Sequence, residues 1–244
     1  MRGIAVAVSC LCLLAPSAEG GGGPPPEQAR LLRSIESDLA ECAPSTGIPR
    51  LSAAVRAALL AVPRDRFVPE GMRRHAWENR ALPIGHGQTI SQPTIVALMT
   101  ELLAVGPADT VLEIGTGSGY QAAVLGQVLP RGRVYSIEIV PELAERSRQL
   151  LRDLGAHNVE VITGDGYAGL PRAAPFAGII VTAVGREVPP ALAAQLAPGA
   201  RLVMPVGDPD GEQWLTVYAR APGGTFSGRA VLPVRFVPLT GGGP

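Results

Sequence analysis

Three glycines alternate with other residues in one stretch of the chain, and an acidic residue stands just before them. Within Val111–Tyr120, Glu113 lies two positions before Gly115, and Gly117 and Gly119 follow at every second position. Glycine is required where the backbone turns sharply and a ligand has to approach it closely. The dinucleotide fingerprint has two residues between its last two glycines, whereas this stretch has one. The preceding acid and the shorter spacing favour a cofactor that carries positive charge and no pyrophosphate, which indicates S-adenosylmethionine.

Two further acids stand where the next two strands are predicted to end. Glu138 comes 19 residues after Gly119, and Asp165 lies between two glycines in Gly164–Gly166. An acid at the end of the second strand accepts hydrogen bonds from ribose hydroxyls in doubly wound nucleotide-binding folds. We expect Glu138 to bind the ribose, and Asp165 with Gly166 to bind the adenine. The competing interpretation is that any strand-to-helix turn carries glycine and that Glu138 is a solvated edge residue. Acids at the ends of three successive predicted strands favour S-adenosylmethionine over a dinucleotide.

A polar loop, Leu82–Pro93, precedes a predicted helix and carries two hydroxyl groups near its end. Apolar residues at helical spacing over 95–103 predict the helix, with Pro93 in its first turn. Free N–H groups at a helix N-terminus bind anions, and Thr89 and Ser91 add hydroxyl donors there. The loop is therefore a candidate carboxylate-binding site. Residue type alone favours the alternative that Ser91 is the N-cap of the helix, because serine is common at that position.

The rest of the chain alternates apolar strands with helices. Strands are predicted at Thr110–Ile114, Arg133–Ile139, Val159–Thr163, Gly178–Ala183 and Ala200–Val206. Helices are predicted at Gly119–Val128, Pro141–Leu154 and Pro189–Leu196, with two earlier ones at Glu27–Cys42 and between Ser52 and Pro63. Strands that are apolar throughout and separated by helices form parallel sheets covered on both faces. We therefore predict an α/β fold with a mostly parallel, doubly wound sheet.

Two segments do not follow the alternation of strand and helix. The runs 213–219 and 230–239 have no helix between them, which predicts an antiparallel hairpin at one edge of the sheet. The segment 64–92 is polar and rich in proline and glycine, and we expect it to be irregular. An irregular segment of that length inside a compact protein is either functional or wrongly assigned.

Five stretches of the chain carry recognisable motifs. They are Gly87–Pro93, Leu112–Tyr120, Gly164–Gly166, Ile179–Ala183 and Arg235–Leu239. Together they resemble the protein-L-isoaspartate O-methyltransferase family, in order, from about Arg30 to Leu239. Gly87–Pro93 is the distinctive stretch, because the glycine motif alone fits many methyltransferases. The resemblance implies a Rossmann-like S-adenosylmethionine-dependent methyltransferase fold, with extra N-terminal helices and a C-terminal extension that helps to enclose the substrate.

The resemblance also implies a reaction and a set of substrate-binding residues. A methyl group passes from S-adenosylmethionine to the free carboxylate of an L-isoaspartyl or D-aspartyl residue in a damaged protein. Ser91 aligns with the family's active-site serine, which reverses the preference for an N-cap. The implied substrate-binding residues are Thr89, Ile90, Ser91, Val237 and Pro238. A carboxylate with a pKa of about 4 is ionised at neutral pH, so this reaction needs no general base.

The chain departs from the family pattern at three positions, which bear on substrate preference rather than on the reaction. Trp77 and Asn79 stand where tyrosine and aspartate are usual, and Ala177 stands where aspartate commonly follows Pro-Phe. His86 lies in the polar loop, where it either contacts substrate or fills the turn. Two other functions stay open: a methyltransferase acting on a small-molecule carboxylate, and an exported binding protein with a vestigial nucleotide fold.

Composition excludes several other classes of protein. All 21 basic residues are arginine, so neither a Schiff-base lysine nor a P-loop lysine is available. The formal net charge of zero argues against a nucleic-acid partner, which requires a basic surface. The three cysteines and three histidines show no zinc-ligand spacing, so we expect no metal.

The N-terminus is expected to lie outside the folded unit. Residues 1–26 are predicted to be a signal-like segment with a Gly/Pro linker, since a short apolar run follows Arg2. Residues 27–109 are predicted to hold the N-terminal helices and the substrate loop, and 110–244 the cofactor-binding core with its extension, all in one compact unit. The family resemblance implies a cytoplasmic protein, whereas the segment 1–18 indicates export to the periplasm or exterior. We expect a monomer with no stable membrane insertion, because the apolar run is too short to span a bilayer.

Overall fold

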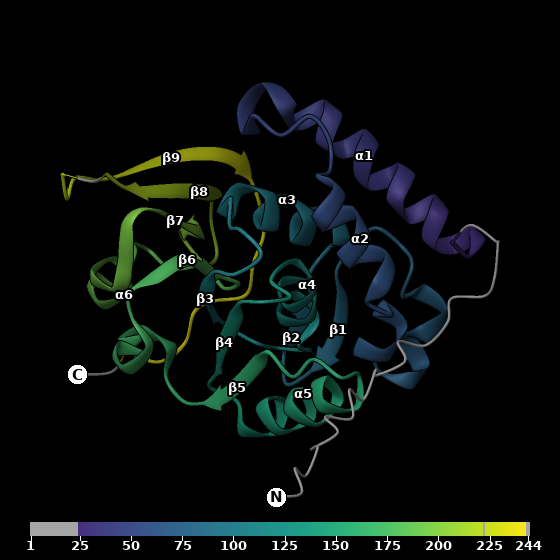
Figure 1. The fold of residues 1–244 in the computed structure, drawn as a ribbon. Helices are drawn as coiled ribbons and strands as arrows, with labels where there is room; N and C mark the ends of the chain where they lie inside the picture. The colour runs from purple at the N-terminus through teal and green to yellow at the C-terminus, as the bar shows by residue number, and fades with distance from the viewer. Residues whose placement is uncertain (1–23, 222, 243–244) are drawn as a thin grey trace, which may run out of the picture.

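A seven-stranded sheet forms the centre of the protein (Figure 1). The computed structural model describes residues 24–221 and 223–242, so the signal-like segment 1–18 lies outside the described residues. The strands are β3 (Thr110–Ile114), β4 (Arg133–Glu138), β5 (Val159–Thr163), β6 (Phe176–Val181), β7 (Leu196–Gly207), β8 (Gln213–Arg220) and β9 (Phe226–Pro233). Their order is β5-β4-β3-β6-β7-β8-β9, in which β3 to β7 run parallel and β8 and β9 are antiparallel. The predicted parallel sheet with an antiparallel edge is confirmed.

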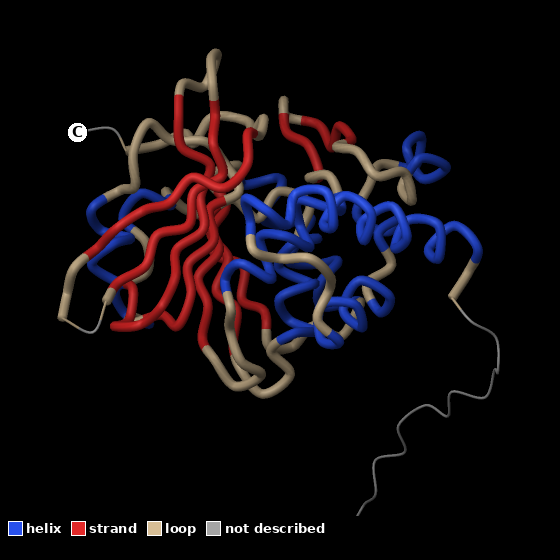
Figure 2. Tube along the Cα trace, turned by 90° about the horizontal axis from the view of Figure 1, so that it is seen from above, coloured by secondary structure: helices blue, strands red, loops and turns tan. Residues whose placement is uncertain are grey.

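Helices cover both faces of this sheet, as Figure 2 shows. The chain begins with α1 (Pro26–Thr46), α2 (Ala53–Ala61) and α3 (Pro93–Leu103), and the later helices are α4 (Tyr120–Val128), α5 (Pro141–Asp153) and α6 (Pro190–Gln195). Short 3-10 helices occur at η1 (Arg64–Phe67), η2 (Glu70–His75), η3 (Gly166–Ala168) and η4 (Pro171–Ala173). Because both faces of the sheet are covered, its central strands are apolar throughout.

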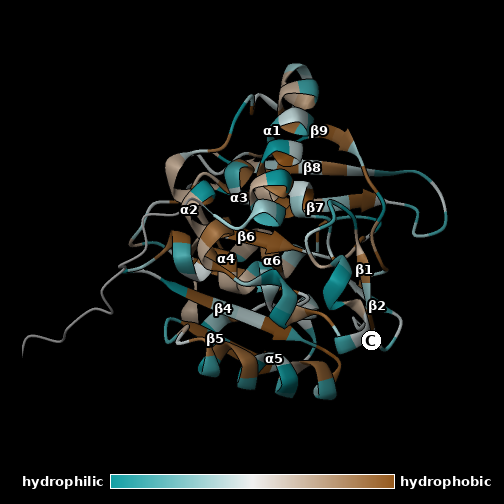
Figure 3. Ribbon diagram, turned by 90° about the vertical axis from the view of Figure 1, so that its right-hand side faces the viewer, coloured by the Kyte–Doolittle hydropathy of each residue, from teal (hydrophilic) through white to brown (hydrophobic). Residues whose placement is uncertain are grey.

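The helices present their apolar sides to the core. In α1 the buried residues Leu31, Leu32, Ile35 and Leu39 recur at helical spacing and belong to the main hydrophobic cluster. The outer helix α5 is hydrophilic along the side that faces away from the sheet (Figure 3), and its buried residues, apart from Ser147, are apolar. Burial of these apolar stripes, rather than helix propensity, is the main source of helix stability here.

The segment 64–92 is more regular than its composition predicts. It contains η1, η2 and an antiparallel hairpin of β1 (Leu82–Gly85) and β2 (Gln88–Ile90). His86 and Gly87 form the turn with positive φ angles of 54° and 70°, the combination that suits a two-residue hairpin loop. The prediction of an irregular segment was therefore wrong for the hairpin. His86 is exposed at its tip and lines neither of the cavities described below.

The last strand also differs from its prediction. The run 230–239 was expected to be a strand, but β9 ends at Pro233. Beyond it the chain leaves the edge of the sheet and crosses to the segment that follows β6. There the Val184 N–H donates to the Val237 carbonyl at 2.9 Å, and the Leu239 N–H donates to the Val184 carbonyl at 2.8 Å. This crossing brings the C-terminal segment to the carboxyl ends of the parallel strands.

Within residues 24–221 and 223–242, none of the helices has the length and apolar character that crossing a membrane requires.

Candidate active site

The glycine loop follows β3 and turns into α4. Gly115 has a φ of +92°, and a Cβ at this position would overlap the hydroxyl of Thr182. That hydroxyl donates to the Gly115 carbonyl at 2.5 Å, which holds the loop against the end of β6. Gly119, with a φ of +86°, is the N-cap of α4. The loop therefore leaves an open space above the strand ends, and only glycine permits its path at Gly115.

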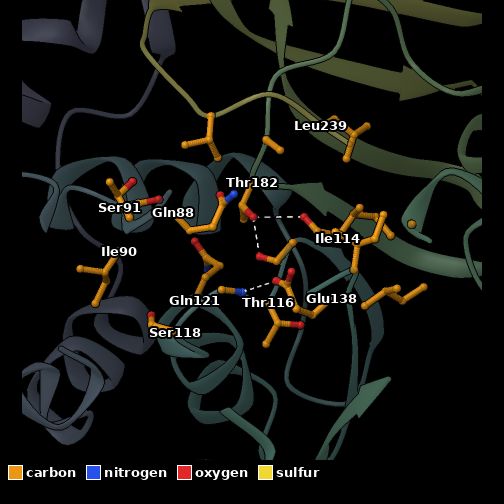
Figure 4. A pocket seen from close by; sticks show the side chains of 18 of the residues that line it. Gln88, Ile90, Ser91, Ile114, Thr116, Ser118, Gln121, Glu138, Thr182 and Leu239 are labelled. Atoms are coloured by element: carbon orange, nitrogen blue, oxygen red, sulfur yellow. Dashed lines mark hydrogen bonds between the residues drawn. The ribbon is translucent and has the colours of Figure 1, made fainter. Parts of the chain in front are cut away.

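Glu138 lies at the end of β4 and faces this space. Its side chain accepts hydrogen bonds from the Gly117 N–H at 2.7 Å and from the Val140 N–H at 3.0 Å. The residue is 5% exposed. Figure 4 shows its carboxylate beside the glycine loop. Each carboxylate oxygen has lone pairs beyond the one that its N–H partner uses, so Glu138 is able to accept further hydrogen bonds from a ligand.

Glu113 lies behind the loop and is completely buried. One carboxyl oxygen accepts a hydrogen bond from the Ser136 hydroxyl, and the other has no partner among the described residues. The pKa of Glu113 is raised to about 8, mainly by burial; the Ser136 hydrogen bond lowers it in part, and the negative charge of Glu138 contributes a smaller increase. A positive charge bound near the loop would favour the ionised form. Glu113 itself does not line the cavity.

The raised pKa of Glu113 makes the stability of the ligand-free protein depend on pH. Between the ordinary value of 4.5 and about 8, the folded protein holds a proton on Glu113 that the unfolded chain releases. The contribution of this group to the free energy of unfolding therefore falls as pH rises through that window, by at most about 1.4 kcal/mol per pH unit. We expect Glu113→Gln to remove this decline. Denaturant unfolding of both proteins between about pH 5 and 8 measures it, and parallel pH profiles would contradict the prediction.

The space above the glycine loop is here called the glycine-loop cavity; its empty volume is about 750 Å³, including the part that is open to solvent. Its walls include most of the residues that the sequence singled out: Thr89, Ile90, Ser91, Gly115, Gly117, Glu138, Gly166, Val237 and Pro238. Three of the residues singled out, Glu113, Gly119 and Asp165, do not line it. The structure thus brings together the polar loop, the glycine loop and the C-terminal segment, which are far apart in the sequence.

Asp165 is exposed at the end of β5, outside the cavity wall. One of its carboxylate oxygens accepts from the Tyr167 N–H at 2.9 Å, and the other accepts from the Gly242 N–H at 2.6 Å. A Cβ on Gly241 would overlap this carboxylate, so glycine permits the close approach of the C-terminal segment. Next to Asp165, Gly166 is buried and lines the cavity.

A second space, here called the open groove, adjoins the first and holds about 1800 Å³ of empty volume, open to solvent. Its walls are formed by α1, the segment before β1, the start of α3 and residues 232–237. Four residues line both spaces: Thr89, Ser91, Thr182 and Val237. Any group transferred from one space to the other has to pass between these side chains.

Ser91 lies at this junction and is not the N-cap of α3. The N-cap is Gln92, which makes no side-chain capping bond. The first-turn N–H of Thr94 instead donates to Oδ1 of Asn79 at 3.1 Å. The alternative that residue type alone favoured, a capping serine, is therefore wrong, because an acceptor from a distant segment takes its place. The Ser91 hydroxyl is half-buried and has no hydrogen-bond partner within the described part of the chain.

Several polar residues of the site were not singled out in the sequence. Gln88, Gln121 and Thr182 lie around the junction (Figure 4), and Thr116 and Ser118 line the loop side of the cavity. Thr182 follows the end of β6, so the same argument about strand ends that selected Glu138 would have found it. Gln121 is buried on α4, where nothing in the local pattern distinguishes it from a core residue.

Arg64 was also missed, and it connects the segment before the hairpin to the glycine loop. Its guanidinium is completely buried, donates to the carbonyls of Ala76 (2.9 Å) and Arg80 (3.3 Å), and lies 4.9 Å from the ring centre of Tyr120. Burial lowers its pKa to about 10. Tyr120 is the first residue of α4, directly after the glycine loop. Arg64 therefore fixes the position of the segment before the hairpin relative to the glycine loop.

Comparison with known proteins identifies the family. The model of the family Protein-L-isoaspartate(D-aspartate) O-methyltransferase (PCMT) matches residues 37–243. The chain belongs to this family. A relative from Syntrophobacter fumaroxidans, protein-L-isoaspartate O-methyltransferase 2, is 47% identical over 242 residues, which cover 98% of this chain and 97% of the relative. The family resemblance read from the five motif stretches is thus confirmed.

Solved structures of PCMT proteins share the fold. A protein-L-isoaspartate O-methyltransferase superposes with a TM-score of 0.77 at 28% identity, covering 88% of this chain and 66% of that one. A Plasmodium falciparum chain named for the same activity, in complex with S-adenosyl-L-homocysteine, gives a TM-score of 0.71 at 24% identity over 86% of this chain and 98% of that one. The predicted Rossmann-like methyltransferase fold is confirmed. In the described part of this chain, no three His, Cys, Asp or Glu side chains are grouped so that they could hold a metal ion.

Proposed function

We propose that this PCMT-family chain transfers a methyl group from S-adenosylmethionine to the free carboxylate of L-isoaspartyl, and D-aspartyl, residues in damaged proteins. One observation carries the proposal. The glycine-loop cavity and the open groove meet at the hydroxyl-bearing residues Thr89, Ser91 and Thr182. A donor in one space and an acceptor in the other would face each other there.

The residues of the glycine-loop cavity fit the proposed cofactor. Glu138 has spare lone pairs for two ribose hydroxyls, and Gly115 and Gly117 let a ligand approach the backbone. Asp165 and Gly166 would bind the adenine, and for Asp165 this requires sharing or releasing the Gly242 N–H. The carboxyl group of Glu113, with one unpartnered oxygen, lies behind the loop, and a bound positive charge would favour its ionised form. When bound, S-adenosylmethionine supplies an electrophilic methyl group on a positively charged sulfur.

The acceptor carboxylate would be held by donors at the junction. It is ionised at neutral pH, so no side chain has to remove a proton from it. The hydroxyls of Ser91 and Thr89 would each donate a hydrogen bond, which fixes the orientation of the reacting oxygen. Ile90, Val237 and Pro238 would exclude water and hold the two reactants together, since alignment and desolvation account for most of such a rate enhancement.

The openness of the groove favours a polypeptide over a small acid. Sites for small molecules enclose most of the surface of their ligand, whereas this groove is open to solvent. Its walls are formed in part by α1 and by residues 232–237. A chain would be able to lie along the groove and place one side-chain carboxylate at the junction.

The test compares two peptides of the same sequence that differ at one position, an isoaspartyl residue or an aspartyl residue. Transfer of labelled methyl from S-adenosylmethionine is measured with the purified full chain. We expect methylation of the isoaspartyl peptide alone. A small dicarboxylic acid, N-acetylaspartate, is the third substrate. Methylation of this acid in preference to both peptides would favour the hypothesis of a methyltransferase that acts on a small-molecule carboxylate. Methylation of neither peptide would refute protein repair.

A further inference from the structure

Asn79 is the centre of a hydrogen-bond network that joins α1 to the start of α3. Its side-chain N–H₂ lies within hydrogen-bond distance of Asp38 (2.8 Å), Thr94 (2.9 Å) and Ser34 (3.0 Å). Its carbonyl oxygen accepts from the Thr94 backbone N–H at 3.1 Å. The Thr94 hydroxyl in turn donates to Asp38 at 2.7 Å. Asp38 and Thr94 line the open groove, so the network forms part of the substrate wall.

The sequence offers the Thr94 N–H a nearby side-chain acceptor, but the structure gives it a distant one. A serine three residues before a first-turn N–H is the usual side-chain acceptor at a helix N-terminus, and Ser91 occupies that position relative to Thr94. In the structure Asn79 takes this bond instead, from 15 residues upstream. Ser91 is thereby released from capping, and its hydroxyl stays free at the junction of the cavity and the groove.

We propose that Asn79 is a positioning residue for methyl transfer, which acts by capping α3 so that the Ser91 hydroxyl remains available to the substrate carboxylate. The inference rests on the proposed function of Ser91. The network also explains why an amide, and not a carboxylate, stands at position 79. An aspartate there would face Asp38 at the distance where Asn79 now donates, and two carboxylates in contact repel each other.

The main test is Asn79→Ala with an isoaspartyl peptide as substrate. Without Asn79, Ser91 is expected to turn and cap the Thr94 N–H, so kcat should fall about 10- to 100-fold. The affinity for S-adenosylhomocysteine should change less than about twofold. In the Ser91→Ala background, Asn79→Ala should cause little additional loss, because both changes remove the same hydroxyl from the junction. Additive losses, or an unchanged kcat in Asn79→Ala, would overturn the proposal.

Conservative variants separate capping from stability. Asn79→Asp keeps an acceptor for Thr94, so it should retain most of the activity while lowering stability through repulsion of Asp38. In the double variant Asn79→Asp with Asp38→Asn, the amide stands at position 38 and the carboxylate at position 79. The hydrogen bond between the two side chains is then able to form in the opposite direction, so stability should recover. Ser34→Ala, which removes one bond of Asn79 but not the cap, is the matched control. Loss of kcat in Asn79→Asp equal to that in Asn79→Ala would refute the capping role, and this comparison remains decisive if Asn79→Ala does not fold.

A crystal structure of Asn79→Ala supplies a readout that does not depend on the substrate. We expect the Ser91 hydroxyl within hydrogen-bond distance of the Thr94 N–H. A Ser91 side chain that still faces the junction would overturn the proposal even if activity fell. If the unmodified protein methylates no isoaspartyl peptide, the proposed function fails, whereas the position of Ser91 in the variant still decides the role of Asn79.

Discussion

Replacing Ser91 with alanine is expected to lower kcat for an isoaspartyl peptide by about 10²- to 10³-fold, the usual effect of removing one preorganised donor at a reacting oxygen. The hydroxyl has no other hydrogen-bond partner among the described residues, and its side chain lies at the junction of the two spaces. Its loss should leave the glycine loop intact. The dissociation constant of S-adenosylhomocysteine, measured by calorimetry, should therefore change by less than about twofold.

Two controls make the Ser91→Ala result specific. Ser37 is exposed on α1 and lines neither the cavity nor the groove, so Ser37→Ala should leave kcat and the affinity for S-adenosylhomocysteine unchanged. Ser91→Thr keeps the hydroxyl and adds a methyl group, and it should recover part of the activity. If Ser91→Ala weakens cofactor binding as much as it lowers kcat, Ser91 supports the loop and does not orient the substrate.

The carboxyl edge of the sheet was predictable from the sequence because strand ends are local features. Apolar runs of five to six residues followed by Glu138 or by Gly164–Gly166 place polar groups at one edge, whatever the rest of the fold does. The structure puts the ends of β3, β4 and β5 side by side, in the order that a doubly wound sheet requires. The approximate location of the cavity followed from this pattern alone.

Other features were not predictable, because they depend on contacts across long stretches of chain. The strands β1 and β2 have four and three residues, and their His86-Gly87 turn lacks the asparagine or aspartate that usually marks a hairpin. Asn79 reaches Asp38 and Thr94, 41 and 15 residues away, and nothing near it in the sequence indicates a cap. Nor did the sequence indicate that Glu113 is buried outside the cavity wall, with Ser136 of the neighbouring strand as its hydrogen-bond donor.

The C-terminal segment completes the site only because the chain leaves the edge of the sheet. A strand over 230–239 would have kept Val237 and Pro238 on the antiparallel edge, away from the glycine loop. By ending β9 at Pro233, the chain crosses to Val184 and brings these residues to the cavity wall. Proline cannot donate to a strand ladder, so Pro233 and Pro238 favour this departure. The stretch Arg235–Leu239, which resembles a motif of the family, is therefore a crossing segment and not a strand.

Glu138→Ala is expected to weaken the binding of S-adenosylhomocysteine by about 10²- to 10³-fold. The change removes a charged acceptor that holds the Gly117 and Val140 N–H groups and that would accept from the ribose hydroxyls. A hydrogen bond to a charged group contributes about 1.5–3 kcal/mol, and two such bonds at the lower end of this range, about 3–4 kcal/mol together, correspond to the expected loss of affinity. With cofactor at saturation, kcat should stay within a few-fold of the unmodified protein, because Glu138 does not reach the open groove.

Two variants show whether the charge and the position of Glu138 matter. Glu138→Gln keeps one acceptor oxygen, so it should weaken binding by only about tenfold, measured by the same calorimetric titration. Glu160 lies on the neighbouring strand β5, where it pairs with Arg133 and Arg172 at the surface, and Glu160→Ala should leave the affinity unchanged. Equal losses in Glu138→Ala and Glu160→Ala would mean a general electrostatic effect of removing acids from this edge. Unchanged affinity in Glu138→Ala would place the ribose elsewhere, since no other acidic side chain among the described residues lines the glycine-loop cavity.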